Sequence, residues 1–282
     1  MQTPRPRRSA LYLPASNARA IAKARTLPCD VVILDLEDAV APEAKADARR
    51  LAVQAAAEGG FGPRELVIRC NGLDTPWGPD DVAALRQAQP DAVLVPKIDN
   101  AAALAVYAET LGGAPLWAMV ETCKAVLRLD DLAGAAQDFP LRALVLGTND
   151  LSREMRLPAA AGREPLKPAL AMTVTAARGH GLAVLDGVFN TLDDLDGLAE
   201  ECAQAAAFGF DGKTVIHPSH LETCNRAFTP GPEAVAWARR VVAAYADPAN
   251  AAAGAIRLDG RMVERLHLDE ARDLLARAAA VD

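Results

Sequence analysis

The feature that most constrains the fold is a regular alternation of short apolar runs with longer alanine-rich segments, repeated up to about residue 228. The apolar runs are rich in Val, Ile and Leu, which is typical of strands buried on both faces of a parallel sheet. Eight such runs are present, which is the strand number of a (β/α)₈ barrel. They are Ala10–Pro14, Val31–Leu36, Leu66–Cys70, Ala92–Pro96, Leu116–Val120, Ala143–Gly147, Ala183–Val188 and Thr214–Ile216.

The segments between the runs carry apolar residues at helical spacing and are expected to be helices. An open, doubly wound sheet is the competing architecture, and it calls for a glycine-rich phosphate-binding turn after the first strand. That turn is absent, because the first run ends in Pro14-Ala15-Ser16-Asn17. The sequence therefore predicts an α/β fold, a (β/α)₈ TIM barrel. The expected helices are Asn17–Leu27, Ala44–Glu58, Asp80–Ala88, Ala101–Leu111, Leu127–Gln137, Pro168–His180 and Leu192–Gly209.

The last part of the chain departs from this alternation at the turn cluster Thr229-Pro230-Gly231-Pro232. Beyond it we expect a helix over 233–245, a short strand over 255–258 and a final helix over 262–279. We predict two domains: a barrel with a metal site over 1–228, and a C-terminal helical, lid-like extension over 229–282. Apolar helices appended to a closed barrel need a partner surface, because otherwise they leave an exposed apolar patch.

Composition narrows the class of function. The 282 residues carry a net charge of −7, and the five cysteines show no regular spacing and no CxxC pair. Acidic chains are poorly suited to nucleic acid or to anionic membranes. No apolar stretch is long enough for a transmembrane helix, and the irregular cysteines are typical of reduced thiols. We expect a cytoplasmic protein that acts on small molecules, with no nucleic-acid or membrane partner.

Ionisable residues follow nearly every expected strand. Because the active site of such a barrel lies at the carboxyl ends of its strands, these residues are expected to meet at one rim. Charges at a single strand end often mark only where the chain meets water, but carboxylates gathered around one axis repel each other unless a cation binds. The residues are Asp35, Glu37 and Asp38, Arg69, Lys97, Glu121, Asp150, Asp186 and His217.

The pair Glu121 and Asp150 is the expected metal site, because these acids follow neighbouring strands. Oxygen ligands without a Cys or His cluster favour Mg²⁺, with Mn²⁺ possible, over Zn²⁺. Mg²⁺ commonly takes one or two protein carboxylates and fills its other positions with water and substrate oxygens. Taken alone, two such acids are a weak indication, since many barrels place acids there.

Several motifs together resemble the citrate lyase β-subunit family, within the HpcH/HpaI-type aldolases that include malyl-CoA and citramalyl-CoA lyases. The similar segments extend over nearly the whole chain, and the LDLEDAV and GKTVIHP segments are specific in combination. They are Arg8–Ala15, Leu34–Val40, Ile68–Gly72, Val95–Lys97, Val120–Thr122, Gly147–Leu151 and Gly212–Pro218.

The resemblance implies a (β/α)₈ barrel, Mg²⁺, a homotrimer or hexamer, and a carbon–carbon lyase reaction. The substrate would be a 3-hydroxy-acyl-CoA such as malyl-, citramalyl- or citryl-CoA, cleaved reversibly to an acyl-CoA and an α-oxo acid. By position, Glu121 and Asp150 match the family's metal ligands, and Arg69 matches its substrate-binding arginine. Arg69 is expected to act in catalysis too, because a guanidinium can stabilise enolate charge on a thioester oxygen. A surface ion pair is the alternative for Arg69.

Other residues near the expected rim have less defined roles. Arg8 and Lys97 are expected to join Arg69 and Glu121 in binding the substrate. Three further acids would order metal-bound water or pair with Arg8 and Lys97, and a purely structural ion-pair network is the alternative; they are Asp35, Glu37 and Asp38.

One position departs from the resemblance. Family lyases often carry an aspartate in the C-terminal segment, which closes over a neighbouring subunit's site and serves as acid or base, and Glu264 stands at that position here. Since glutamate is longer by one methylene, its carboxylate must be placed differently, and a misplacement of about 1 Å can cost on the order of 10²-fold in rate. Glu264 is thus either a catalytic acid/base or a carboxylate on a helix surface.

Two other functions stay open at this point. One is a CoA-independent aldolase acting on a free hydroxy-oxo acid. The other is a catalytically weak subunit that binds a thioester. The lid-like extension suits a long thioester and so argues against the CoA-independent aldolase. The presence of Arg69, Glu121 and Asp150 argues against the catalytically weak subunit. The sequence leaves open the acyl group, the oxo acid and whether the thioester is hydrolysed.

Overall fold

A computed structural model describes residues 5–281. The chain divides into two compact units, Arg7–Ala227 and a tail from Phe228 onward. The first unit is a closed barrel of eight parallel strands in sequential order, and β1 pairs with β8 to complete it. The predicted TIM-barrel fold is therefore confirmed. Its strands are β1 (Ser9–Pro14), β2 (Val31–Asp35), β3 (Glu65–Arg69), β4 (Ala92–Val95), β5 (Leu116–Val120), β6 (Leu141–Leu146), β7 (Ala183–Asp186) and β8 (Gly212–Val215).

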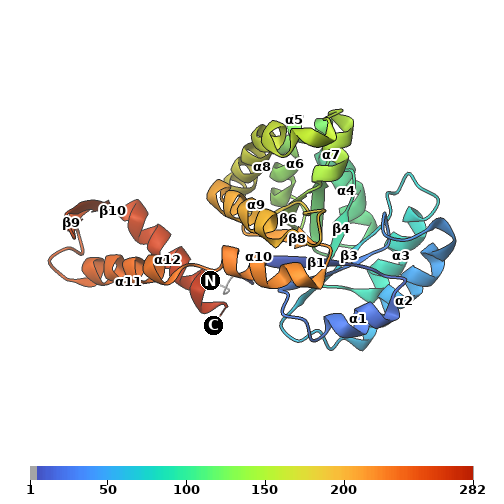
Figure 1. Ribbon diagram of the computed structural model, residues 1–282, viewed down its shortest axis with the longest axis horizontal. Helices are drawn as coiled ribbons and strands as arrows, with labels where there is room; N and C mark the ends of the chain where they lie inside the picture. The colour runs from blue at the N-terminus through green and yellow to red at the C-terminus, as the bar shows by residue number, and fades with distance from the viewer. Residues whose placement is uncertain (1–4, 282) are drawn as a thin grey trace. The chain divides into compact units, whose positions relative to one another are not determined.

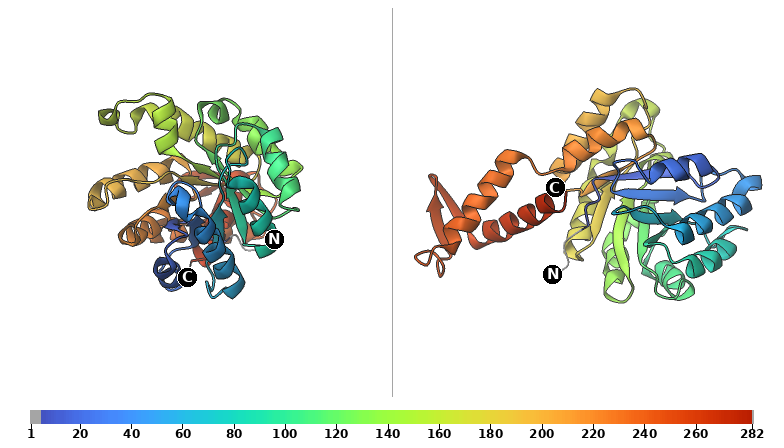
Figure 2. Two further views of the ribbon diagram at one scale, coloured as in Figure 1. Left: turned by 90° about the vertical axis from the view of Figure 1, so that its right-hand side faces the viewer. Right: turned by 90° about the horizontal axis from the view of Figure 1, so that it is seen from below.

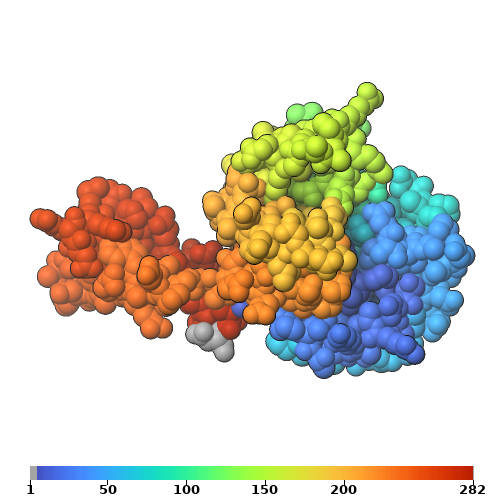
Figure 3. Space-filling model, viewed as in Figure 1, coloured from blue at the N-terminus to red at the C-terminus, as the bar shows by residue number. Residues whose placement is uncertain are grey.

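Helices surround the strands, as the views in Figures 1 and 2 show. In the space-filling view the beginning of the barrel unit, in blue, lies beside its end, in orange (Figure 3), in agreement with the pairing of β1 with β8. The helices of this unit are α1 (Ala18–Ala24), α2 (Lys45–Glu58), α3 (Gly78–Ala88), α4 (Ala101–Thr110), α5 (Cys123–Leu127), α6 (Leu129–Gly134), α7 (Thr148–Glu154), α8 (Lys167–Gly179), α9 (Leu195–Phe208) and α10 (Leu221–Phe228).

Local sequence explains several helix boundaries. The side chains of Asn17, Asn100 and Asp194 accept hydrogen bonds from the first turns of α1, α4 and α9, which satisfies amides that have no partner within the helix. Helix α9 ends at Phe208, and the next residue is Gly209, whose φ of +97° suits glycine. All eight expected strands are present, with ends shifted by at most two residues. The short helices α5, α7 and α10 were not predicted, because each has too few turns to show a clear period.

The tail contains α11 (Pro232–Ala246), an antiparallel hairpin of β9 (Ala255–Leu258) and β10 (Arg261–Glu264), and α12 (Arg265–Ala279). The expectation of one helix over 262–279 is wrong for its first three residues, which belong to β10. The missed signal is Asp259-Gly260 between two short apolar segments, since both residues have positive φ, as a tight hairpin turn requires.

The two tail helices pack on each other. Val241 and Tyr245 of α11 and Leu268 of α12 belong to one apolar cluster, which Val263 of β10 completes. The tail thus buries much of its own apolar surface, while Met262 and Leu266 stay exposed within the chain. None of the described helices is long and apolar enough to cross a membrane.

Candidate active site at the carboxyl ends of the barrel strands

Alternation along the strands determines which side chains face the barrel axis. The barrel interior is filled by a cluster that includes Ile33 of β2, Val67 of β3 and Met119 of β5. Because side chains alternate with a period of two, the next inward positions are Asp35, Arg69 and Glu121. The polar rim is therefore the continuation of the apolar core, one layer nearer the carboxyl ends of the strands.

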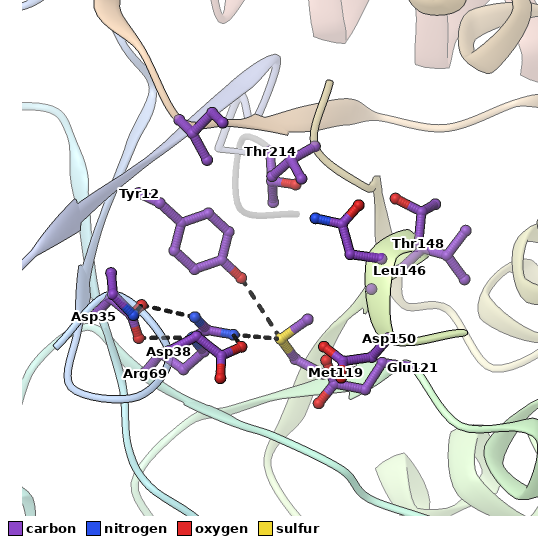
Figure 4. A pocket seen from close by; sticks show the side chains of 15 residues that line it. Tyr12, Asp35, Asp38, Arg69, Met119, Glu121, Leu146, Thr148, Asp150 and Thr214 are labelled. Carbon is purple, nitrogen blue, oxygen red and sulfur yellow. Dashed lines mark hydrogen bonds and ion pairs between the residues drawn. The ribbon is translucent and has the colours of Figure 1, made fainter. Parts of the chain in front are cut away.

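These strand ends enclose a cavity of about 290 Å³ (Figure 4). Five of the predicted site residues line it, namely Asp35, Asp38, Arg69, Glu121 and Asp150. The remaining lining residues come from β1, β5, β6 and β8, from the start of α7, and from the segments after β2, β6, β7 and β8. They are Tyr12, Ala39, Met119, Leu146, Gly147, Thr148, Asn149, Val188, Thr214 and Ile216.

Arg69 is held in a fixed orientation. Its Nε and Nη2 donate to the two oxygens of Asp35, both at 2.7 Å, and its Nη1 lies 2.7 Å from Oε2 of Glu37. Arg69 is only 7% exposed, so the alternative of a surface ion pair is excluded. A buried guanidinium at the cavity wall can meet a carboxylate or a developing oxyanion without first losing a water shell.

Glu37 links Arg69 to Lys97. The Lys97 ammonium donates to Oε1 of Glu37 at 2.5 Å, and the backbone N–H of Lys97 donates to Oε1 of Glu121 at 2.7 Å. Burial, against the attraction of Arg69, raises the pKa of Glu37 above its ordinary value. Asp38 differs from Asp35 and Glu37, because its side chain is 59% exposed and lies 3.6 Å from Arg69. The ion-pair network that was expected as the alternative is present for Asp35 and Glu37.

The residues present fit a divalent cation. Glu121 is 1% exposed, and burial together with the negative charge of Glu37 raises its pKa to about 7. Figure 4 shows the side chains of Glu121 and Asp150 close together at the cavity. A buried carboxylate beside another carboxylate is stabilised in its charged form by a cation. Among residues 5–281 no cluster of three or more His, Cys, Asp or Glu side chains is arranged around a metal position, so water and substrate oxygens would complete the coordination of Mg²⁺.

Gly147 leaves room for the side chain of Glu121. A Cβ at this position would lie 2.5 Å from Cβ of Glu121 and 2.7 Å from its Oε2, which is closer than real contacts. Asp150 follows on α7, where its Oδ1 accepts from Arg153 at 2.6 Å. The Arg153 side chain is 78% exposed, so this ion pair is weak and can be exchanged for a metal ligand at little cost.

The expectation that Arg8 binds substrate is wrong in position. Arg8 precedes β1, and its guanidinium and backbone N–H donate to Asp30, which precedes β2. Both residues therefore lie at the amino ends of the strands, whereas the cavity lies at the carboxyl ends. Of the three acids Asp35, Glu37 and Asp38, Glu37 pairs with the Lys97 ammonium.

Asp186 and His217 make structural contacts outside the cavity. Asp186 is fully buried and pairs with Arg163 and Lys213, and the attraction of these cations outweighs burial and lowers its pKa. The Nδ1 of His217 lies 2.7 Å from Oγ of Ser219 and shapes the turn after β8. Neither residue lines the cavity.

Glu264 lies in the tail, at the N-cap of α12. Its backbone N–H donates to Nδ1 of His267 at 2.9 Å, and its side chain accepts from the backbone N–H of His267, so the two residues form a capping box. The carboxylate thus has a local structural role, at the boundary of the helix rather than on its surface.

Sequence reasoning missed Tyr12 and Met119. Tyr12 was read only as part of an apolar strand, although it alternates inward with Ala10, which belongs to the interior cluster. Met119 precedes Glu121 by two residues on β5 and faces inward for the same reason. The alternation of side chains along each strand could have identified both residues, but only once it is known which positions of the strand face inward.

Comparison with known proteins agrees with this geometry. A family model described as HpcH/HpaI aldolase/citrate lyase matches residues 8–218. The chain is 42% identical over 276 residues to a (3S)-malyl-CoA thioesterase of Cereibacter sphaeroides, covering 98% of this chain and 96% of the relative. It is 32% identical to the citrate lyase subunit beta of Escherichia coli, covering 97% of this chain and 94% of that protein.

A solved structure is similar over almost the same length. Protein CitE of Mycobacterium tuberculosis, crystallised in complex with magnesium, acetoacetate and coenzyme A, matches with a TM-score of 0.78 and 31% identity. The match covers 96% of this chain and 97% of that chain.

Proposed function

The chain belongs to the HpcH/HpaI aldolase/citrate lyase family, and we propose that it is a Mg²⁺-dependent enzyme acting on the CoA thioester of a short 3-hydroxy dicarboxylic acid, such as malyl-CoA. The observation that carries the proposal is that buried Arg69 and the carboxylates of Glu121 and Asp150 line one cavity. This combination offers fixed positive charge for a carboxylate or oxyanion beside a place for a divalent cation.

Hydrolysis of the thioester is the first candidate reaction. It is favoured by the 42% identity to a malyl-CoA thioesterase over nearly the full length of both proteins. In this reaction water adds to the thioester carbon, the carbonyl oxygen gains negative charge, and the C–S bond breaks to release the carboxylic acid and free CoA.

Carbon–carbon cleavage is the second candidate, favoured by the similarity to citrate lyase subunit beta. Here the 3-hydroxyl loses its proton, the bond between carbons 2 and 3 breaks, and the electron pair moves onto the thioester as an enolate that is then protonated. The products of malyl-CoA would be acetyl-CoA and glyoxylate. Both reactions place negative charge on the thioester oxygen, so one electrostatic environment serves either.

The chain's own residues have separable roles in this proposal. Glu121 and Asp150 would hold Mg²⁺, which supplies Lewis-acid polarisation of a substrate carbonyl and neutralises substrate carboxylate charge. Arg69 binds and orients the substrate and stabilises charge that develops on it. Asp35 and Glu37 fix the guanidinium through the 2.7 Å contacts, and Lys97 holds Glu37 in turn.

The proposal is tested by incubating the purified protein with malyl-, citramalyl- and citryl-CoA and Mg²⁺, with two readouts in parallel. A thiol reagent reports free CoA, and a carbonyl reagent reports the α-oxo acid. Thiol without oxo acid means hydrolysis, and oxo acid without thiol means carbon–carbon cleavage. Glu121→Gln, and wild type with a chelator, should be inactive in both.

The Glu121→Gln preparation guards against a contaminating thioesterase, because a contaminant would stay active in it, and a matched control shows that loss of an acid elsewhere is harmless. Asp130→Asn changes an acid whose side chain is 99% exposed, and this variant should keep wild-type activity. If wild-type protein yields neither product from any of the three thioesters, the proposed function is wrong. Oxo acid formed from free hydroxy-oxo acids alone would instead support a CoA-independent aldolase, and thioester binding without turnover would support a catalytically weak subunit.

A further inference from the structure

The hydroxyl of Tyr12 has an unusual environment. Tyr12 lies on β1, its ring belongs to the boundary of the apolar interior, and its side chain lines the cavity. In Figure 4 its hydroxyl is directed toward Met119, between Arg69 on one side and Thr214 on the other. It is thus a neutral donor placed among the charged groups proposed to bind substrate.

The hydrogen-bond partner of this hydroxyl is weak. Within residues 5–281, the Tyr12 Oη donates only to Sδ of Met119, at 3.6 Å. A thioether sulfur is a poor acceptor compared with a carboxylate or carbonyl oxygen. Arg69 Nη1 approaches the same sulfur at 3.8 Å. Two donors on the cavity wall therefore converge on one poor acceptor, and either gains by exchanging it for a substrate oxygen.

The ring is also held in place. The Arg69 guanidinium lies over it, 5.0 Å from its centroid, and Asp35 fixes that guanidinium. A phenol keeps its proton at neutral pH, and burial raises the pKa of Tyr12 further above its ordinary value. The hydroxyl is therefore a donor oriented before substrate arrives, which is the arrangement that stabilises developing negative charge at low reorganisation cost.

We propose that the Tyr12 hydroxyl is a catalytic hydrogen-bond donor to the thioester oxygen of the substrate, acting beside Arg69 as that oxygen gains negative charge. The inference rests on the proposed function but not on which of its two reactions occurs, because both charge the same oxygen. The competing explanation is structural: the hydroxyl would serve only to hold Met119 in the core.

Two variants separate these explanations. Tyr12→Phe removes only the hydroxyl, while Met119→Leu removes only the sulfur acceptor and keeps a similar volume. If Tyr12 acts on the substrate, Tyr12→Phe should lower kcat by at least about tenfold, toward the 10²–10³-fold reported for loss of one oxyanion donor, with a smaller change in KM. Met119→Leu leaves the donor in place, so its loss of kcat should be clearly smaller than that of Tyr12→Phe.

The controls report folding and the metal site. Tyr107→Phe removes another tyrosine hydroxyl, one that accepts from the backbone of Leu73 outside the cavity, and it should keep kcat. Urea unfolding and Mn²⁺ titration should give near wild-type values for Tyr12→Phe. The assay uses malyl-CoA or whichever of the three thioesters the wild type converts.

Each other result overturns something definite. An unchanged kcat for Tyr12→Phe, or an equal loss of kcat in Met119→Leu, overturns the catalytic role of Tyr12 and leaves the proposed function intact. The catalytic role is also overturned if Tyr12→Phe loses kcat but at the same time unfolds at clearly lower urea concentration or binds Mn²⁺ with clearly lower affinity. A wild type inactive on all three thioesters overturns the proposed function and the role of Tyr12 with it.

Discussion

Replacing Asp35 by Asn should both destabilise the barrel and disable the site. The Asp35 carboxylate accepts four hydrogen bonds: Oδ1 from the Glu37 amide at 2.8 Å and Arg69 Nε at 2.7 Å, Oδ2 from the Ala39 amide at 3.0 Å and Arg69 Nη2 at 2.7 Å. Asparagine keeps one oxygen and turns an NH₂ toward the other two donors. Whichever way the amide is oriented, two donors lose their acceptor.

The size of the effect follows from burial. Each unsatisfied buried donor costs about 1–3 kcal/mol, and breaking a buried ion pair costs about 3–5 kcal/mol. Because Glu37 still neutralises Arg69, we expect Asp35→Asn to lower the free energy of unfolding by about 3 kcal/mol, near the lower end of that range. In urea, with a slope of about 2–3 kcal/mol per molar, the midpoint should fall by about 1 M or more.

The same change should reduce turnover, since Arg69 loses the bidentate contact that orients it. A displacement of about 1 Å costs on the order of 10²-fold in kcat/KM. Asp130→Asn is the matched control, because that side chain is 99% exposed and its loss should leave the urea midpoint unchanged. A stability loss below about 1 kcal/mol in Asp35→Asn would refute the reasoning, because it would mean that the four contacts are replaceable by water.

Three further predictions concern the metal, the arginine and the assembly. Glu121→Gln and Asp150→Asn should each abolish Mn²⁺ binding by calorimetry and leave the urea midpoint near wild type; normal affinity in the double variant would put the metal elsewhere. Arg69→Lys keeps the charge but loses the planar fork, so kcat/KM should fall at least about tenfold, or about 1.4 kcal/mol, and an unchanged value would remove Arg69 from the mechanism. If the protein is a homotrimer or hexamer whose tail completes a neighbouring site, mixing inactive Glu121→Gln with inactive Glu264→Gln subunits should restore part of the activity, and a monomer by light scattering would rule out shared sites.

The barrel was predictable because its strands are buried on both faces and so stand out as apolar runs. The same burial makes inward and outward positions equally apolar, which hides the register. Period two then relates Tyr12 to Ala10 and Glu121 to Met119 only after one inward residue is known. The acids and Arg69 were found because charge at a strand end is conspicuous, whereas Tyr12 resembles ordinary core.

Arg8 shows the opposite error. It was expected to bind substrate together with Lys97, but the cavity lies at the carboxyl ends of the strands and Arg8 lies at the amino end of β1. Arg8 immediately precedes β1 and pairs with Asp30, which precedes β2. It lies six residues before Pro14, the last residue of β1, and so at the opposite end of the barrel from the cavity. Strand rise is about 3.3 Å per residue, so this separation is on the order of 20 Å.

For Glu264 the relevant quantity is the stabilisation that its carboxylate gives to the start of α12. Its capping box with His267 stabilises the start of α12, and an N-cap is worth about 0.5–2 kcal/mol. A carboxylate released from that cap to transfer a proton would lose this stabilisation at every turnover, a factor of about 2 to 30 in the population of the competent state. That cost is smaller than the rate gain from a well-placed acid or base, which is about 10²–10⁴-fold. The capping box is therefore compatible with a catalytic role of Glu264, but it is no evidence for one. Both candidate reactions move a proton, because hydrolysis deprotonates the attacking water and carbon–carbon cleavage protonates the enolate. If the Glu264 carboxylate leaves its cap to transfer a proton, Glu264→Gln should therefore lower kcat whichever reaction occurs; if it stays in the cap, the change should affect only the stability of α12.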